Sequence, residues 1–359
     1  MVKRLLVLNG LAALMVVVYH AASYGFNAMF LWTNRYQPVA VPNYDQLGSL
    51  SYYILILVRQ IAEFAIPGFL FVSGFFIAFA ARASRAGINS DFIASRVKKL
   101  VIPFAIWTVV AIVLLRRFPP TVEQILSMYY YIPLIIQFYL LSPLIVPLAR
   151  KHWQVLLIVA AVLQLGIQGL RHLQVLGISL PGLDLMIRLT PMWFFPGHLF
   201  FFSIGVVAGV HLKAFSVWIN RYRWVLLSAT VILLVLSVVE YQEMAYLAGE
   251  KWVGPAFSGL SRTLFAMAFV LAFLAFDKVR LPLSDKISYL GEKSLGIYFV
   301  NIPAIYLIAV LLYRGLPWML GKQILYQPVL ILFGLSVPLV LMAFFSKSPG
   351  RRVYRYLFG

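Results

Sequence analysis

Long apolar runs recur from one end of the chain to the other, separated by shorter polar segments. Each run holds about 18 or more mostly apolar residues, and a helix of that length crosses the ~30 Å hydrocarbon core of a bilayer. We expect about ten such helices, over residues 5–25, 52–81, 100–116, 124–148, 153–170, 191–212, 224–241, 259–277, 294–313 and 325–346. The pattern therefore predicts an all-α polytopic membrane protein, a single domain over residues 1–359 with no separate soluble domain.

Basic residues gather at one set of span ends. The chain has 30 Lys and Arg against 11 Asp and Glu, a net charge of +19. Twenty of the basic residues lie on the side of the membrane that holds the N-terminus, eight lie on the opposite side, and Arg59 and Arg262 fall within or at the ends of spans. The positive-inside rule therefore predicts that both termini are cytoplasmic. Cations at span ends indicate contact with the head groups of anionic membrane lipids rather than with nucleic acid.

Several kinds of chemistry lack the residues that they need. The chain has no cysteine, which excludes disulfides and thiolate metal sites. No HExxH, paired-acid or phosphate-loop pattern occurs, which disfavours a metal hydrolase or a P-loop enzyme. We therefore expect no metal site and no permanently bound cofactor.

An ionisable side chain, His20, lies at the far end of the first apolar run. Such a group is costly in a membrane helix unless it has a partner or a function. Asn9 precedes it by eleven residues, about three helical turns, so both side chains share one helix face about 16 Å apart. They could line opposite ends of one cavity. The alternative is a helix-end histidine that hydrogen-bonds a backbone carbonyl at the membrane interface.

The second apolar run carries two charged residues, Arg59 and Glu63, at positions i and i+4. This spacing allows an ion pair on one helix face, at a depth similar to that of His20. The pair could orient the imidazole and adjust its pKa, or it could simply neutralise itself. Ser73 follows in the same run, and we expect it to have a packing role because no base lies near it in the sequence.

Cations and a second histidine mark two further candidate positions. Arg96 and Lys99 precede the third apolar run and could hold the phosphates of a nucleotide-bearing donor, or serve only as a topology signal. His198 lies about two turns into the sixth run. Loops expected on the outer side, among them 171–190, combine aromatic and charged residues. This composition suits sugar binding, but aromatic residues also gather at membrane interfaces for partition reasons alone.

The ordered series of short motifs resembles acyltransferase family 3, bacterial integral-membrane proteins that O-acylate cell-surface glycans. Each motif alone is weak, but in series they cover nearly the whole chain. The segments that carry the resemblance are Leu8–His20, Phe69–Phe76, Arg96–Pro103, Tyr139–Pro143, Phe194–Gly209, Gly291–Pro303 and Ser348–Arg352.

This resemblance implies a function and a set of roles. The donor would be a cytoplasmic acyl-coenzyme A, acetyl by default, and the acceptor a hydroxyl of a glycan or lipid-linked sugar across the bacterial inner membrane. His20 matches the family's essential histidine and would act as general base or acyl carrier, with Arg59 and Glu63 assigned beside it on geometry. Donor contacts would come from Arg96, Lys99 and Asn9, and substrate contacts from Ser73, Tyr139, His198 and Asn301.

The chain departs from the family pattern at two positions. Asn9 stands where the family usually has an arginine, and Asn301 stands where it commonly has a histidine. An amide can hydrogen-bond a carbonyl or hydroxyl, but it cannot offset phosphate charge or transfer a proton. Two alternatives therefore stay open: a lipid-linked sugar flippase or other transporter without covalent chemistry, and a catalytically degenerate family member. The sequence leaves the oligomeric state open.

Overall fold

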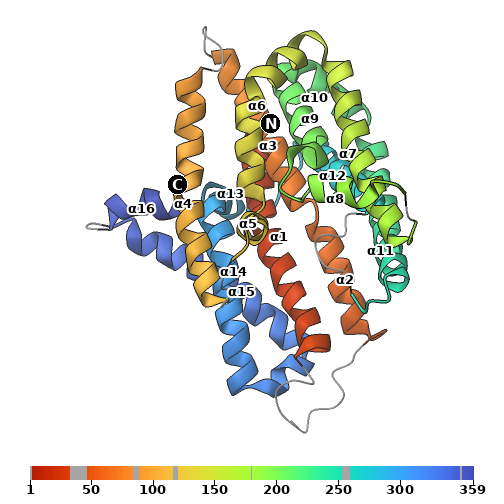
Figure 1. The fold of residues 1–359 in the computed structure, drawn as a ribbon. Helices are drawn as coiled ribbons and strands as arrows, with labels where there is room; N and C mark the ends of the chain where they lie inside the picture. Colours follow the sequence, from red (N-terminus) through yellow and green to blue (C-terminus); the bar gives the residue numbers. More distant parts are fainter. Residues whose placement is uncertain are drawn as a thin grey trace.

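In the computed structural model, helices dominate the described residues, which are 2–32, 47–83, 89–115, 120–178, 180–252, 259–347 and 350–359. Figure 1 shows long helices running roughly side by side, with α15 leading obliquely to the short α16 at one side. The helices are α1 Val2–Phe26, α2 Leu50–Ala62, α3 Ala65–Ala83, α4 Ser90–Leu114, α5 Val122–Met128, α6 Tyr131–Lys151, α7 Trp153–Val175, α8 Leu183–Leu189, α9 Leu199–Val210, α10 Leu212–Arg221, α11 Arg223–Leu247, α12 Leu260–Ala275, α13 Ser284–Glu292, α14 Ser294–Gly315, α15 Gln323–Phe345 and α16 Arg351–Phe358.

The protein is an all-helical multi-pass membrane protein. In the described part of the chain, eight helical segments are long and apolar enough to cross a membrane. The α9–α10 pair passes the same test but bends by 110°, and α12 is a shorter apolar helix. Eight of the ten expected spans thus correspond to helices that pass this test, and α9–α10 and α12 lie at the positions of the other two. Ser348 and Pro349, in the last resembling segment, lie outside the described residues.

Three expected spans contain breaks that the hydropathy pattern does not mark. The second span divides into α2 and α3 at a turn over Glu63 and Phe64, because Pro67 has no N–H to donate to the carbonyl of Glu63. The fourth divides where α5 ends at Met128 and α6 begins at Tyr131. The sixth begins with a short 3₁₀ helix, Phe195–His198, before α9.

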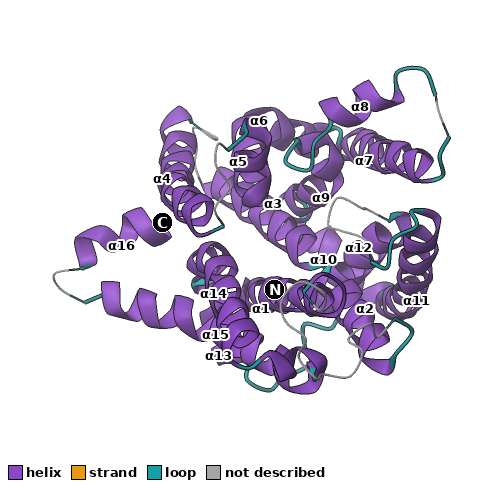
Figure 2. Ribbon diagram, turned by 60° about the horizontal axis from the view of Figure 1, so that its bottom comes forward, coloured by secondary structure: helices purple, strands orange, loops and turns teal. Residues whose placement is uncertain are grey.

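Helix α1 lies at the centre of the structure. It contacts α2, α3, α12, α13, α14 and α15, and Figure 2 shows these helices around it. A helix that is apolar on every side suits such a position, because each of its faces meets another helix. The polar groups of α1 therefore face protein along most of its length.

Glycines allow α3 and α9 to pack unusually close together. A Cβ atom on Gly74 would collide with the carbonyl oxygen of Phe202, and one on Gly205 would collide with the carbonyl oxygen of Phe71. Small residues that permit backbone contact are a common means of helix association in membranes. The resembling segments around Gly74 and Gly205 thus form one helix–helix contact.

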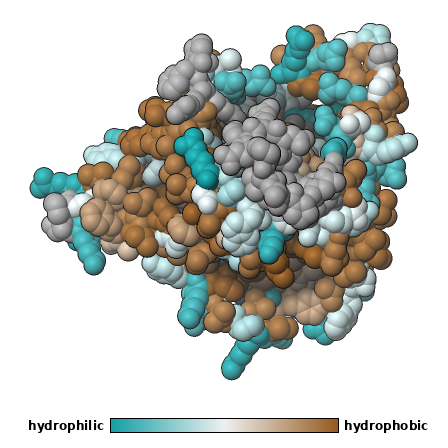
Figure 3. Space-filling model, turned by 90° about the horizontal axis from the view of Figure 1, so that it is seen from below, coloured by the Kyte–Doolittle hydropathy of each residue, from teal (hydrophilic) through white to brown (hydrophobic). Residues whose placement is uncertain are grey.

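The outer faces of the peripheral helices are apolar. Val155, Ile158 and Val162 are more than half exposed and recur along one stripe of α7. Hydrophobic side chains cover much of the periphery visible in Figure 3, with hydrophilic ones scattered at the edges. Such a surface is stable against lipid tails rather than water.

Substitution of Gly205 by alanine is expected to destabilise the fold, because the new Cβ forces α3 and α9 apart. Overpacking of this kind costs about 1–3 kcal/mol, so the thermal unfolding midpoint of the detergent-purified protein should fall by several degrees. Gly166→Ala in α7 is the matched control, since no atom lies within 4 Å of its added Cβ. Equal midpoints for the two variants would contradict the proposed close contact.

Candidate functional site

A cavity of about 620 Å³ lies among α1, α3, α4, α6 and α14. Its lining includes five residues that the sequence marks as candidates from distant parts of the chain: Asn9, Ser73, Arg96, Lys99 and Tyr139. The volume falls within the range of small-molecule and cofactor sites. The structure thus brings together all three residues expected to contact a donor and two of the four expected to contact substrate.

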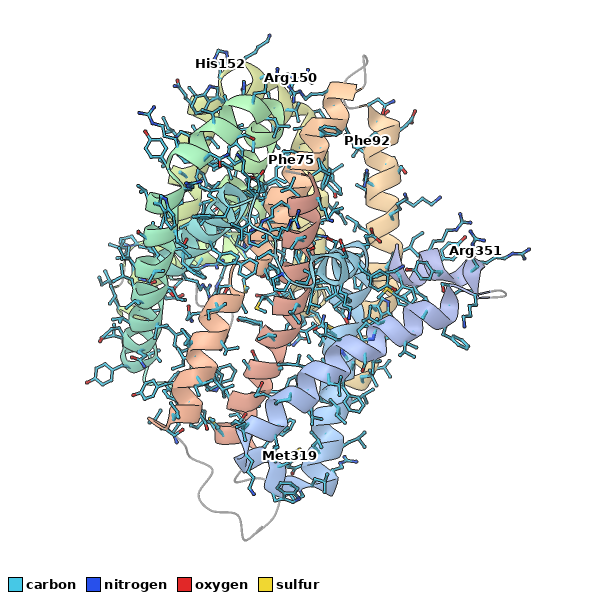
Figure 4. The ribbon with its side chains drawn as sticks, turned by 180° about the vertical axis from the view of Figure 1, so that it is seen from behind. Phe75, Phe92, Arg150, His152, Met319 and Arg351 are labelled. Carbon is cyan, nitrogen blue, oxygen red and sulfur yellow. The ribbon has the colours of Figure 1, made fainter. Side chains whose placement is uncertain are left out.

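The cavity has a cationic mouth and an apolar interior. Arg96 and Lys99 are exposed on the second and third turns of α4, and the Arg96 guanidinium lies over the ring of Phe92, 5.2 Å from its centre. Figure 4 labels Phe92 near the N-terminal end of α4. Further in, the lining is dominated by side chains such as Phe69, Val72 and Ile135. This arrangement suits a ligand with an anionic end and an apolar end.

Asn9 connects α1 to the junction of α13 and α14. Its side-chain amide donates to the carbonyl oxygen of Gly291 at 2.8 Å and to the Ser294 hydroxyl at 3.1 Å. Both amide hydrogens are therefore used within the protein. At this position Asn9 shapes the cavity wall without adding charge to it.

Four tyrosines form a layer at the inner end of the cavity. Tyr131 and Tyr298 line the cavity, and the backbone N–H of Tyr131 donates to the Tyr298 hydroxyl at 3.3 Å. Tyr129 donates to the carbonyl oxygen of Phe299 at 2.9 Å. Tyr130 lies on the far side, close enough to Tyr298, Tyr19 and Glu63 to interact with them electrostatically.

The possibility that Asn9 and His20 line opposite ends of one cavity is not met by this cavity. Asn9 lines the cavity and His20 does not. Both residues belong to α1. Tyr131 and Tyr298 line the cavity, and Tyr298 interacts electrostatically with Tyr130, which in turn interacts with Tyr19, the neighbour of His20. The run Tyr129–Tyr131 was visible in the sequence, yet nothing in its spacing indicated that it would stand between the two candidates.

Arg59 is completely buried beyond this layer. Its guanidinium donates to the Tyr19 hydroxyl at 2.8 Å and to the Tyr241 hydroxyl at 3.4 Å. It also lies over the rings of Tyr19 and Trp252, 4.8 and 5.4 Å from their centres. Arg59 is thus held by aromatic residues of three different segments.

Glu63 pairs with Arg262 of α12 at 2.7 Å and not with Arg59, so the expected i, i+4 pair is wrong. Glu63 caps the C-terminus of α2, and its carboxylate meets the guanidinium of Arg262 in place of that of Arg59. The partner lies 199 residues away in the chain. Arg262 was recognisable only as a cation near a span end.

His20 is partly buried beside this group of charges. Its ring lies edge-on to that of Tyr19, 5.7 Å away, and the charge of Arg59 acts on it. Among the described residues the imidazole makes no hydrogen bond, either to a backbone carbonyl or to the side chains of Arg59 and Glu63. Its ring nitrogens are therefore not committed to a described protein group.

His198 belongs to the same region as His20 and not to the cavity. Its ring lies 6.3 Å from that of Tyr130, its Nδ1 atom is buried without a hydrogen-bond partner, and the charges of Arg171 and Arg262 act on it. Across all the residues that the structure describes, no group of three or more His, Asp and Glu side chains could hold a metal ion.

Asn301 does not line the cavity, and its substrate role stays a prediction. The side chain is fully buried in α14 and donates to the carbonyl oxygens of Ile297 and Tyr298, at 2.8 and 2.7 Å, within its own helix. Ser73 does line the cavity, with its hydroxyl 3.4 Å from that of Tyr131. The amide at position 301 thus supports the helix that carries Tyr298 and reaches no cavity surface.

The family model described as an acyltransferase domain, that of acyltransferase family 3, matches residues 4–344, nearly the whole chain. The chain belongs to acyltransferase family 3. No curated protein and no solved structure matches it. Membership of this family supports acyl transfer as the general activity, carried out by a protein with several membrane-spanning helices.

In this acyltransferase-family protein, Glu63→Gln is expected to lower the free energy of unfolding by about 3 kcal/mol, because it leaves the Arg262 guanidinium without its counter-ion. The measurement is chemical denaturation in detergent. The double variant Glu63→Gln/Arg262→Gln should cost less than the sum of the single changes. Asp285→Asn, which breaks the exposed pair with Lys3, is the control and should change stability little. Additive effects of Glu63→Gln and Arg262→Gln would rule out the coupling.

Proposed function

We propose that this protein transfers an acyl group, acetyl by default, from acyl-coenzyme A in the cytoplasm to a hydroxyl of a glycan or lipid-linked sugar on the other side of the bacterial inner membrane. The single observation that carries the proposal is the cavity with Arg96 and Lys99 at its mouth and an apolar interior, in a chain of acyltransferase family 3.

The donor would enter the cavity with its phosphates toward the two cations. Lysine and arginine form charge-assisted hydrogen bonds with phosphate oxygens. The acyl and pantetheine parts would extend past Asn9 into the apolar interior, where the hydroxyls of Ser73, Tyr131 and Tyr139 offer hydrogen bonds. This orientation is supported by a lining that combines two exposed cations of α4 with apolar and hydroxyl-bearing side chains.

The reaction would proceed with His20 as the base. The imidazole accepts the proton of the acceptor hydroxyl while the hydroxyl oxygen attacks the thioester carbonyl carbon. The carbon–sulfur bond then breaks, and the thiolate of coenzyme A takes a proton from the imidazolium. The products are an ester and free coenzyme A. In a two-step form of the reaction, His20 would carry the acyl group before the acceptor receives it.

The acyl group must pass the tyrosine layer to meet His20. Asn9 and His20 are about 16 Å apart along the α1 axis, and the rings of Tyr131 and Tyr298 close the cavity between them. A flexible thioester arm would need these rings to change rotamer. Side-chain movement of this kind, rather than movement of whole helices, is the simplest route between the two sides.

Replacement of both mouth cations, in Arg96→Gln/Lys99→Gln, is expected to raise the KM for acyl-coenzyme A by about tenfold or more, because charge-assisted hydrogen bonds to phosphate contribute about 1.5–3 kcal/mol. The assay measures coenzyme A release by purified protein with acceptor present. Lys98→Gln is the matched control, since Lys98 lies between the two cations in sequence but outside the cavity lining. A KM that rises equally in both proteins would contradict the proposed donor position.

His20→Ala is expected to lower acyl transfer by at least about 100-fold, because general-base catalysis contributes about that factor or more. His152→Ala, at the exposed junction of α6 and α7 (Figure 4), is the control and should retain activity. Transfer is followed by mass spectrometry of surface glycan and by coenzyme A release. A protein that releases no coenzyme A with acceptor present would favour transport. Release that is independent of acceptor, or a fully active His20→Ala protein, would contradict this mechanism.

A further inference from the structure

Three arginines are linked electrostatically into one group, of which Arg59 acts on His20, and the described carboxylates do not balance their charge. Arg59, Arg171 and Arg262, with Glu63 and His198, are called the arginine cluster below. Arg262 acts electrostatically on both Arg171 and His198, and Tyr19 experiences the charges of Arg59, Glu63 and Arg262. The cluster therefore forms one electrostatic unit, contributed by α2, α7, α12, the 3₁₀ helix that ends at His198 and the turn between α2 and α3.

The cluster carries an excess of positive charge among the described residues. Glu63 neutralises Arg262. A second carboxylate, that of Glu240, pairs instead with His172 and accepts hydrogen bonds from the backbone N–H groups of Leu260 and Ser261 at the start of α12. Arg59 donates only to two tyrosine hydroxyls, and Arg171 donates to the carbonyl oxygen of Thr190 at 2.6 Å. Two guanidinium groups thus lack a described carboxylate partner.

Uncompensated guanidinium groups are expensive at membrane depth, and ionisable residues there commonly serve ligands or ion pathways. The Nε atom of Arg59, a fully buried residue, has no hydrogen-bond partner, and neither do the side-chain atoms of the neighbouring Gln60, which is 1% exposed. Buried polar atoms without partners are rare, and each calls for an explanation such as a missing ligand or water.

We propose that the arginine cluster binds an oxyanion group, a carboxylate or a phosphate, carried by the acceptor. This inference rests on the proposed function and narrows its substrate to an acidic or phosphorylated sugar. Arg171 is the direct contact, because it is partly exposed and Thr190 uses only one of its five N–H donors. His198 adds a ring nitrogen without a partner, and Arg59 supplies a fixed positive charge from behind.

The acceptor hydroxyl would then be presented to His20 by an anchored anion. An arginine binds carboxylate and phosphate in a fixed, often bidentate geometry, so the anchor would orient the sugar as well as attract it. Glu63 limits the excess charge, because its pairing with Arg262 leaves that guanidinium largely neutralised. A neutral sugar would leave the charge of Arg171 uncompensated and should bind less well.

The test compares three sugars on the purified protein in neutral detergent: D-glucuronate, D-glucose 1-phosphate and D-glucose, at equal ionic strength and without acyl-coenzyme A. Dissociation constants come from the dependence of the thermal unfolding midpoint on sugar concentration. At least one acidic sugar should bind about tenfold or more tightly than glucose, because it gains a charge-assisted hydrogen bond. The stronger of the two identifies a carboxylate or a phosphate as the natural group.

Variants of Arg171 localise the effect. Arg171→Gln should remove the preference for acidic sugars, and Arg171→Lys should keep part of it because the charge remains. Arg188→Gln, an exposed arginine in α8, is the matched control and should leave the preference unchanged. If Arg171→Gln does not fold, the sugar comparison in the wild-type protein and in Arg171→Lys decides the matter.

Equal affinities for the three sugars, the absence of binding by either acidic sugar, or an unchanged preference in Arg171→Gln would overturn the proposal. Because this test uses no acyl donor, its result is separate from that of acyl transfer. Acidic sugars that bind at Arg171 without any coenzyme A release would leave the anion site standing and remove the proposed function. Acyl transfer to neutral sugars alone would leave the proposed function standing and remove the anion site.

Discussion

The enclosure of α1 by other helices is the constraint on which the remaining structure depends. A helix at this position exposes little of itself to lipid, so its polar side chains must find protein partners or face internal space. Asn9 reaches the junction of α13 and α14, and Tyr19 accepts a hydrogen bond from Arg59. Both ends of the candidate site are thereby attached to a single helix.

The tyrosine layer divides that site into two chemically different parts. On one side lies the apolar cavity with its cationic mouth, and on the other lies a group of buried charges around His20. Under the proposed function the two substrates come from opposite sides of a membrane, and such a division would keep an open passage from leaking water and ions. Aromatic side chains can form this division and can still change rotamer to admit a thioester arm.

Close packing of α3 and α9 fixes the position of the cavity relative to the arginine cluster. Gly74 and Gly205 let the backbones approach, while α3 supplies cavity residues and the 3₁₀ helix before α9 supplies His198 to the arginine cluster. The break between α2 and α3 coincides with Glu63, which pairs with Arg262 of α12. Local irregularities in long apolar segments therefore position the charged groups.

The sequence by itself determined the all-helical membrane fold and the approximate positions of its apolar helices, and it marked Arg96, Lys99, Asn9, Ser73 and Tyr139 one by one as candidates. Hydropathy and helical phase act over short distances along the chain, so a pattern of residues can reveal them. Only the tertiary structure decided that Glu63 pairs with Arg262, that the tyrosines separate Asn9 from His20, and that Asn301 serves its own helix. Ion pairs and aromatic contacts join residues far apart in sequence, and their partners are fixed by helix packing that no local pattern encodes.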